Sequence, residues 1–496
     1  MNTKKTAIII GAGMGGLSTA ARLAKDGYKV TVFEQDKNVG GRANVIKQSG
    51  YTFDTGPTIL MMTDVLYDTF VYCGKNFDDY IELKQLEPNY QVRWQDGSSV
   101  EVSSNLPRFA KSLAAIDPKA PEQFYTFFGQ MAKMYRIGRS KFIDKNFDRV
   151  TDFINLRAGF ELLKSGGLNK LHNYVSKHFT DPRLRMLFSF QSMYLGVSPY
   201  DAPAVYGMVS YMETGLGIWY PKGGMHKLPE AFARLVEDLG GTIKLKTAVK
   251  QILVSDGRTY GVELADGTVV EANVVVCNAD LPYAYKKLLP ESLRPSMKDK
   301  KISSLKQASS ALLFYWGVDS DMPGMLHHNV HFSKDFKANL DEIFYTNTLP
   351  KDPAFYIYIP TKTDPTLAPK GKSVVYILVP VPNLSAGIDW TTATQKIKKT
   401  VLTQIKKSYK IDLEKNIATE AVFTPQDFQD RFNLTDGTAF GLSHYFFQSG
   451  YFRPSNKSKD VKNLYFVGAS TYPGSGVPMV VLSGKLAAER IAKEMS

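Results

Sequence analysis

The start of the chain shows a pattern typical of a strand, a helix and a second strand. Residues Thr6–Ile10 form a short apolar run that ends at a cluster of glycines. Apolar residues then recur at helical spacing from Leu17 to Ala24, and Val30 and Val32 alternate with polar residues up to Glu34. This order predicts the first strand–helix–strand unit of an α/β fold.

Two later segments continue the same kind of patterning. Residues 229–239 have the spacing of an amphipathic helix, and Gly240 and Gly241 follow as a stop signal. Strands are predicted next, with an Asp266-Gly267 hairpin turn before the last one, at residues 242–245, 249–253, 261–264 and 269–276. Near the end of the chain, residues 463–467 predict a strand and residues 482–491 a helix. We therefore expect one α/β unit assembled from the start, the middle and the end of the chain.

Two insertions of different character separate these blocks. Residues 105–215 have a mostly helical pattern rich in Phe, Met and Tyr. Residues 305–385 instead contain apolar runs typical of strands, at residues 311–318, 354–359 and 373–379.

Composition indicates a globular protein with more than one structural unit. The 496 residues are 44% apolar and 22% charged. A formal charge of +13 favours an anionic partner, either nucleic acid or a phospholipid surface. The two cysteines, Cys73 and Cys277, define neither a disulfide framework nor a thiolate metal site and are consistent with a reducing cytosolic setting. No apolar run reaches the ~18–20 residues of a spanning helix.

The glycine cluster after the first strand has the spacing of a dinucleotide-binding motif. Gly11, Gly13 and Gly16 form G-x-G-x-x-G between the predicted strand and helix. The first glycine allows the tight turn, the second admits a pyrophosphate to the backbone, and the third permits close packing of helix and strand. Glu34 ends the second strand about 20 residues later, where a carboxylate accepts hydrogen bonds from a ribose hydroxyl. A glycine-rich turn with an unrelated surface glutamate is the simpler alternative.

Three further segments are suited to contact with a cofactor. Gly40-Gly41-Arg42 combines a flexible backbone with a guanidinium that suits phosphate oxygens or a flavin edge. Phe53–Thr58, which contains Gly56 and Pro57, is rich in turn residues and is expected to pass over a cofactor ring. The segment Asn463–Met479 carries Gly468, Gly476 and Val477 between a strand and a helix, where backbone amides can bind an anion or a ring carbonyl. Each is also compatible with a plain surface loop or connection.

We identify no catalytic constellation of side chains in the sequence. His327, His328 and His331 lie close together, but no carboxylate or cysteine accompanies them at ligand spacing, so we expect a surface loop and no metal site. Neither a nucleophile elbow nor a phosphate loop is present. This suggests that a cofactor performs the reaction, and the catalytic residues stay unknown.

Together, these motifs resemble the flavin-dependent phytoene-desaturase-type carotenoid enzymes, which are relatives of the amine oxidases. The resemblance runs nearly end to end. Within that family, the likeness is strongest to the bacterial dehydrosqualene (4,4'-diapophytoene) desaturases, on the segments Pro57–Met62, Cys73–Leu83, Lys222–Met225, Phe423–Phe428 and Ala439–Leu442. One departure concerns the last motif, where the family commonly has Thr-His-Pro-Gly and this chain has Thr471-Tyr472-Pro473-Gly474. A proton-handling role for that histidine is therefore in doubt.

The resemblance implies an α/β fold with a Rossmann-like FAD-binding domain of the glutathione-reductase and amine-oxidase type, joined to a substrate domain with a β-sheet and helices. The expected limits are 1–60, 225–300 and 460–496 for the FAD-binding domain, 61–104 and 301–459 for a mostly β substrate domain, and 105–224 for a helical region of membrane contact and substrate entry. The resemblance also implies that a set of residues binds FAD, namely Gly11, Gly13, Gly16, Glu34, Gly41, Arg42, Gly56, Pro57, Gly468, Gly476, Val477 and Met479.

The implied reaction is stepwise desaturation of a long apolar isoprenoid, a thirty-carbon carotenoid precursor, by hydride transfer to the flavin. The positive charge that develops is spread over the neighbouring polyene, so a strong protein base need not be visible. The final electron acceptor is not apparent. A forty-carbon phytoene desaturase, an oxidase that forms terminal aldehydes and a soluble amine oxidase stay as alternatives, as does a non-catalytic basic adaptor.

The helical insertion favours a membrane-associated enzyme. Residues 121–190 hold twelve Lys or Arg against six Asp or Glu, interleaved with aromatic residues that include Phe124, Phe127, Phe153 and Phe160. Basic residues beside aromatic ones are typical of a surface that docks on anionic lipid, whereas an ordinary core helix with a solvated face is the alternative. No recognition motif supports nucleic acid. We expect a cytoplasmic protein that is peripheral on the inner face of the cell membrane.

Overall fold

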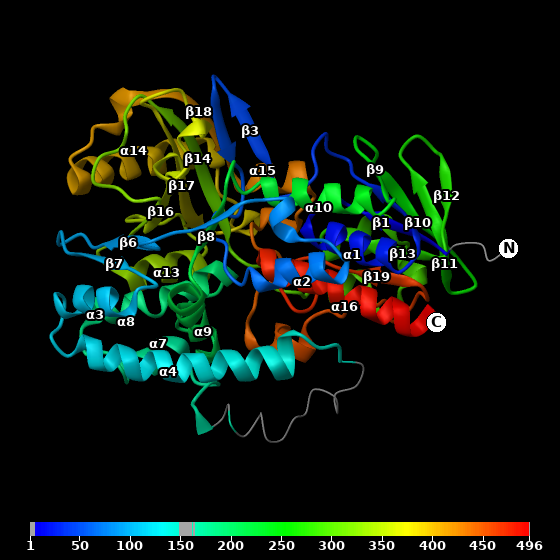
Figure 1. The fold of residues 1–496 in the computed structure, drawn as a ribbon, viewed down its shortest axis with the longest axis horizontal. Helices are drawn as coiled ribbons and strands as arrows, with labels where there is room; N and C mark the ends of the chain where they lie inside the picture. Colours follow the sequence, from blue (N-terminus) through cyan, green and yellow to red (C-terminus); the bar gives the residue numbers. More distant parts are fainter. Residues whose placement is uncertain (1–4, 148–160, 162–163, 496) are drawn as a thin grey trace.

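A five-stranded parallel sheet forms one half of the molecule (Figure 1). The computed structural model describes residues 5–147, 161 and 164–495. The strands lie in the order β19 (Leu464–Phe466), β13 (Val274–Cys277), β1 (Thr6–Ile10), β2 (Lys29–Phe33) and β9 (Thr242–Lys244). All four pairings are parallel, with Ile9 opposite both Val32 and Val276. The strands predicted at 6–10, 29–34, 242–245 and 463–467 are therefore confirmed.

Successive side chains of a strand point to opposite faces of the sheet, so these strands contribute to two separate hydrophobic cores. Ile9, Val32 and Val276 pack under the helices α1 (Met14–Lys25), α10 (Lys227–Asp238), α16 (Val477–Met495) and α2 (Asp64–Tyr72). On the other face, Ile8 and Val275 pack against the antiparallel sheet of β10 (Val249–Ser255), β11 (Arg258–Leu264) and β12 (Val269–Glu271). The helix α16 lies along α1, where the Ser18 hydroxyl donates to the Val481 carbonyl at 3.0 Å.

The single strand predicted at 269–276 is wrong, because the structure divides it between two sheets. β12 pairs with β11, whereas β13 joins the parallel sheet beside β1. Asn273 lies at the break, and its side-chain oxygen accepts a hydrogen bond from the Thr6 amide at 2.8 Å. The chain therefore changes sheets at a polar residue that binds the neighbouring strand.

The second half of the molecule is built on a seven-stranded sheet. Its order is β18 (Ile417–Phe423), β14 (Ser310–Val318), β17 (Ser373–Val381), β16 (Phe355–Tyr358), β15 (His328–His331), β6 (Tyr90–Arg93) and β7 (Ser99–Val102). One face is covered by α14 (Trp390–Tyr409), whose Ile397, Val401 and Ile405 pack on Val375 and Ile377. The strands predicted between 305 and 385 are confirmed.

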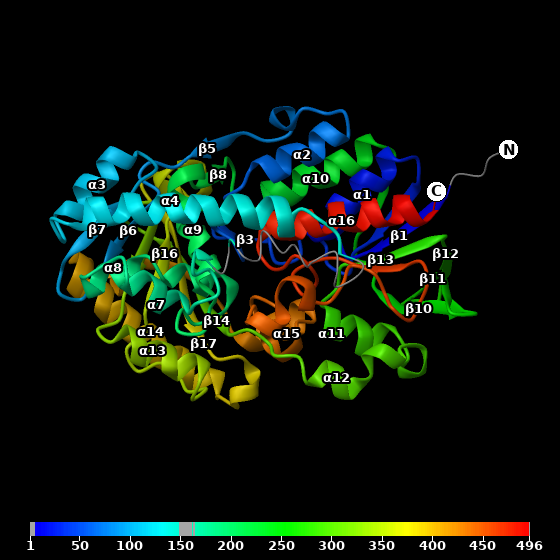
Figure 2. The same cartoon turned by 90° about the horizontal axis from the view of Figure 1, so that it is seen from below.

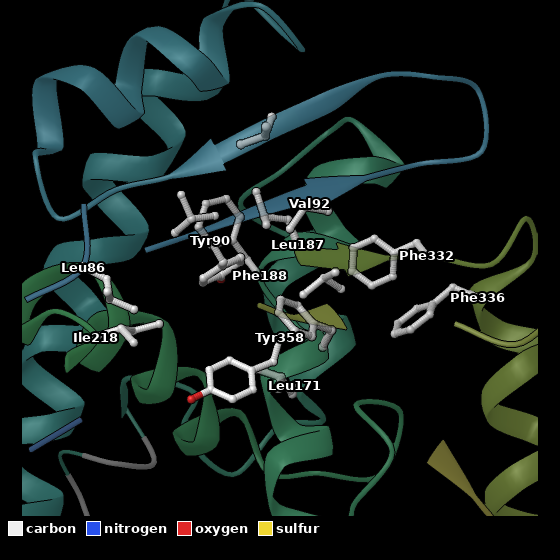
Figure 3. Close-up of a cluster of buried hydrophobic side chains, with 14 of the residues drawn as sticks. Leu86, Tyr90, Val92, Leu171, Leu187, Phe188, Ile218, Phe332, Phe336 and Tyr358 are labelled. Carbon is white, nitrogen blue, oxygen red and sulfur yellow. The ribbon is translucent and has the colours of Figure 1, made fainter. Parts of the chain in front are cut away.

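Helices cover the opposite face and enclose an aromatic core (Figures 2 and 3). They are α3 (Leu106–Ala114), α4 (Ala120–Gly138), α7 (Leu171–Ser176), α8 (Pro182–Leu187) and α9 (Met208–Tyr211). Figure 3 shows Phe332, Phe336, Tyr90 and Phe188 within this cluster. Phe124 and Phe127, two of the aromatic residues predicted at a surface within residues 121–190, are each only 1% exposed, so the structure corrects the prediction at these two positions. Their spacing is that of a buried helix face. Phe153 and Phe160 lie outside the described residues.

Short elements connect these layers. They are the hairpins β3 (Val45–Gln48) with β4 (Tyr51–Asp54) and β5 (Leu83–Gln85) with β8 (Trp219–Pro221), and the helices α11 (Leu281–Tyr283), α12 (Asp299–Ser303), α13 (Phe336–Phe344) and α15 (Pro425–Phe432). Among the described residues, no helix has both the length and the apolar character needed to cross a bilayer. The domain limits stay a prediction.

The histidines predicted in a surface loop instead lie on or beside the buried strand β15. His328 and His331 are fully buried, and His327 is 6% exposed. Hydroxyl partners replace water, since Nδ1 of His327 lies 2.6 Å from Thr363 Oγ1 and Nδ1 of His328 lies 2.6 Å from Tyr356 Oη. Burial lowers the pKa of all three imidazoles. In the described ranges, no three His, Cys, Asp or Glu side chains are grouped to hold a metal ion.

Candidate functional site

The carboxyl ends of the parallel strands meet at one edge of the sheet and open into a cavity of about 1130 Å³. Four of the five strands are closely followed there by a residue that lines the cavity: Gly11 after β1, Glu34 after β2, Asn278 after β13 and Gly468 two residues beyond β19. Such an edge is where ligands bind in open α/β sheets. Of the twelve predicted site residues, all but Gly16 line this cavity.

The glycine motif has little space for side chains. A Cβ on Gly13 would lie 2.7 Å from the Asn278 amide nitrogen, closer than carbon and nitrogen can approach. A Cβ on Gly16 would collide with the Gly11 carbonyl oxygen. Gly16 therefore keeps α1 close to β1, whereas Gly11 and Gly13 leave the backbone open toward the cavity at the start of the helix.

Glu34 is a buried carboxylate held by two backbone amides. The Ala12 amide donates to Oε2 at 2.7 Å, and the Asp36 amide donates to Oε1 at 2.9 Å. Burial raises the pKa of Glu34, and the two N–H donors oppose that rise. The side chain is 7% exposed and lines the cavity, so it offers a fixed acceptor to a ligand hydroxyl.

The Gly40-Gly41-Arg42 motif lies beside the glycine motif that follows β1. The Gly40 amide donates to the Ala12 carbonyl at 2.8 Å, which places Gly41 and Arg42 beside the glycine turn. The Arg42 guanidinium donates from Nη1 to the Ala439 carbonyl at 2.8 Å. Burial lowers the pKa of Arg42, and nearby Asp280 opposes that effect. The Thr55 hydroxyl donates to the Arg42 carbonyl at 3.2 Å, so Gly56 and Pro57 are brought to the same wall.

The C-terminal loop closes the cavity with small residues and the start of α16. The Gly468 amide donates to Ser483 Oγ at 2.9 Å, and Gly476, Val477 and Met479 line the cavity beyond it. Tyr472 also lines the cavity, and its hydroxyl donates to the Phe142 carbonyl. At the position where the family commonly has histidine, this chain therefore has a phenol that contacts the end of the helical region.

A buried histidine from elsewhere in the sequence reaches this loop. His444 lines the cavity, its Nε2 accepts from the Ser475 amide at 3.2 Å, and its Nδ1 lies 3.1 Å from the Leu195 carbonyl. Burial and the neighbouring Arg453 keep its pKa well below the ordinary value. Both ring nitrogens are thus engaged by the backbone, and the neutral imidazole positions the loop.

Sequence reasoning did not identify His444, Asn278 or Asp280. Asn278 follows β13 directly and Asp280 lies two residues further on, so the rule that parallel strands present their carboxyl ends at one edge would have identified them. Asp280 accepts hydrogen bonds from the hydroxyls of Ser470 and Thr435, both at 2.7 Å. His444 carried no sequence signal, because its neighbours are distant in the chain.

The cavity continues from this edge between the seven-stranded sheet and the helices. Its inner part is lined by uncharged and mainly apolar side chains: Phe190, Met193, Tyr194, Val209, Met212, Leu313, Val330, Phe332, Phe336, Phe355, Tyr356, Tyr376 and Leu378. Among its polar groups, the Tyr356 hydroxyl donates to Thr58 Oγ1 at 2.9 Å. A long apolar molecule fits this chemistry, whereas an ammonium group would find no carboxylate among these side chains.

Comparison with known proteins identifies the family. The model for the flavin containing amine oxidoreductases matches residues 14–492. The chain belongs to this family. A zeta-carotene-forming phytoene desaturase of Myxococcus xanthus is 41% identical over 486 residues, which cover 98% of this flavoenzyme and 93% of the relative. A 4,4'-diapophytoene desaturase (4,4'-diaponeurosporene-forming) of Staphylococcus aureus is 37% identical over 497 residues, which cover 98% of each chain.

A solved structure has the same fold. A variant of putrescine oxidase superposes with a TM-score of 0.63 at 13% identity and covers 99% of each chain. The predicted family resemblance, fold class and cofactor are confirmed, and the protein is an FAD-dependent oxidoreductase grouped with the carotenoid desaturases. The open glycine backbone, the fixed carboxylate of Glu34 and the guanidinium of Arg42 fit FAD. The role of each individual residue stays a prediction.

Proposed function

We propose that this flavoenzyme introduces double bonds stepwise into a thirty-carbon carotenoid precursor, from 4,4'-diapophytoene to 4,4'-diaponeurosporene. The observation that carries the proposal is the uncharged inner cavity, which is continuous with the glycine cradle at the sheet edge. The relative from Staphylococcus aureus supports this chain length by its name and by its 98% coverage.

Each part of the site has a proposed task. Gly11 and Gly13, with the start of α1, hold the pyrophosphate of FAD, and Glu34 accepts from the ribose. Gly41, Arg42, Gly56, Pro57 and the loop from Gly468 to Met479 surround the flavin. When bound, FAD supplies the acceptor for hydride.

The chain's own side chains align the substrate and exclude water. Aromatic faces such as those of Phe190, Tyr356 and Tyr376 stabilise positive charge on a bound polyene. A general base is not assigned. A substrate of this kind resides in a bilayer, so we also propose peripheral attachment to the inner face of the cell membrane.

A forty-carbon substrate is the second candidate, and the 41% identity to the relative from Myxococcus xanthus favours it. The test is to supply the purified holoenzyme with either hydrocarbon in liposomes and to follow absorbance. We expect diapophytoene to give bands that move to longer wavelength in discrete steps and to end at a yellow product. If phytoene is consumed faster than diapophytoene, the proposed substrate becomes the forty-carbon hydrocarbon.

If the enzyme oxidises neither hydrocarbon but forms an aldehyde on a preformed carotenoid, the proposed desaturase activity is contradicted. The Gly13→Val variant is the matched control. Its loss of flavin should abolish every product.

A further inference from the structure

Three phenylalanine side chains are exposed together in one short loop. Phe446, Phe447 and Phe452 are 46%, 67% and 50% exposed, although such residues are normally buried. Their ring centroids lie 5.2 to 6.3 Å apart, so they form one patch. In Figure 1, the loop is the orange-red segment below α16.

The loop is held rigidly by a buried arginine. Arg453 is 3% exposed, and its guanidinium donates to five backbone carbonyls, those of Leu442, Ser443, Gln448, Ala469 and Thr471, at 2.5 to 3.4 Å. The Gln448 side chain adds hydrogen bonds with the Lys306 amide and carbonyl, both at 2.9 Å. The outward position of the phenylalanines is therefore fixed by the fold.

The same loop borders the cavity. Phe446 and Phe452 both line it while remaining exposed, and so does Leu168, which is 48% exposed. Tyr206 connects these segments, because its hydroxyl lies 2.8 Å from Ser449 Oγ and the neighbouring Val205 amide donates to the Gly167 carbonyl at 2.9 Å. The cavity thus reaches the surface through an apolar rim.

The two segments that form this rim carry lysines, of which Lys170 is paired with Asp201 and Lys457 with Glu494. The sequence contains no acidic residue from 437 to 459 or from 162 to 180, although both segments contain lysines. Lys306 is exposed, and its ammonium nitrogen lies 5.1 Å from the centre of the Tyr445 ring. Lysines beside exposed aromatic rings are complementary to anionic lipid headgroups above an acyl layer.

We infer that Phe446, Phe447, Phe452 and Leu168 insert into an anionic lipid surface, so that the cavity opens directly into the acyl layer. This inference rests on the proposed function, because an apolar substrate needs a path that avoids water. It moves the lipid contact away from α4, where Phe124 and Phe127 are buried, and from Arg139, which follows α4 and is paired with Asp64 and Asp144.

The test is flotation of the holoenzyme with vesicles of equal parts phosphatidylglycerol and phosphatidylcholine. Phe447→Glu is the informative variant, because Phe447 is the most exposed of the three and does not line the cavity. We expect its vesicle binding to fall roughly tenfold, with flavin content unchanged. Tyr125→Glu, on α4 and 47% exposed, is the matched control and should bind as the wild type does.

Activity separates docking from catalysis. Phe447→Glu should lose turnover of hydrocarbon in vesicles and keep turnover of hydrocarbon dispersed in detergent. Unchanged flotation of Phe447→Glu, or a loss confined to Tyr125→Glu, would overturn the inference. A third result would also overturn the inference: a wild-type dimer that becomes monomeric in Phe447→Glu, with flotation unaltered. The patch would then bind a second copy of the chain. If neither hydrocarbon reacts with the wild type, the proposed function fails, and flotation still tests the docking surface.

Discussion

Gly13 lies where the backbone, the Asn278 side chain and the expected pyrophosphate converge. A valine there would displace Asn278, whose amide nitrogen is 2.7 Å from the position of the new Cβ. We predict that Gly13→Val is purified without flavin, as measured by the ratio of absorbance near 450 nm to that at 280 nm.

Gly129→Val is the control for this variant. Gly129 lies within α4 and has no other atom near its Cβ position. It should retain full flavin content. A folded Gly13→Val protein that is fully yellow would contradict the role of this turn.

Glu213 is a buried carboxyl whose two oxygens differ. Oε2 accepts from the Tyr90 hydroxyl at 2.9 Å and from the Gln191 amide at 3.1 Å, whereas Oε1 has no partner among the described residues. Burial raises its pKa to about 7, against the opposing effect of these donors. The folded state therefore favours the protonated acid.

The sign of the pH effect follows from that rise. The contribution of protonated Glu213 to stability is complete below the unfolded pKa of roughly 4.3 and is lost as pH rises through about 7. We predict that Glu213→Gln removes this loss, which is on the order of 3 kcal/mol between pH 4 and pH 8. Urea unfolding across that range measures it. Equal pH dependence of the variant and the wild type would show that the carboxyl is charged in the fold.

At the scale of elements, the chain from the end of β15 to the start of α13 contributes aromatic rings to the inner lining of the cavity. Phe332 lies between them, 5.5 Å from Phe190 and 5.0 Å from Phe336 between ring centroids. Trp94 stacks behind it at 5.9 Å and does not line the cavity (Figure 3 shows Phe332 and Phe336). The lining there is thus a single layer of rings.

Removing the Phe332 ring should allow the cavity to accept a longer hydrocarbon. We predict that Phe332→Ala raises the rate with a forty-carbon hydrocarbon relative to a thirty-carbon one by roughly tenfold. The measurement is product formed from an equal mixture of both. Phe109→Ala loses a buried ring of the same size outside the cavity, at a similar cost of ~3–5 kcal/mol, and should leave the ratio unchanged. An unaltered ratio in Phe332→Ala would place the chain-length limit elsewhere.

Most regular elements could be predicted because their signal is local. The apolar run Thr6–Ile10 and the alternation through Val30 and Val32 need no distant partner to be recognised. The wrong predictions concern residues whose burial depends on contacts with parts of the chain that are distant in the sequence. His328 is buried because a tyrosine hydroxyl replaces water, and Phe127 faces a core that residues far along the chain complete. The cofactor side of the site follows from motif spacing, whereas His444 and Phe332 become visible only when the sheets are assembled.

At the scale of the whole molecule, the expected FAD site connects four of the five strands of the parallel sheet. Residues that follow β1, β2, β13 and β19 line the same cavity. Ligand binding to the folded state alone stabilises it by ~2.7 kcal/mol at a hundredfold excess over Kd. We predict that the Tm of the apoprotein is lower and rises with added FAD, as measured by thermal unfolding. Gly13→Val should show no such rise, and an apoprotein with the Tm of the holoenzyme would contradict a shared site.

The position of β19 at the end of the strand order also has a consequence for synthesis. Glu34 and the glycine turn are made early, yet the sheet edge that they share with Gly468 lacks its last strand until β19 and α16 have left the ribosome. At ~5–20 residues per second, the roughly 430 residues between β2 and β19 take about 20 to 90 s to translate. The sheet edge at which flavin is expected to bind is therefore completed late in synthesis.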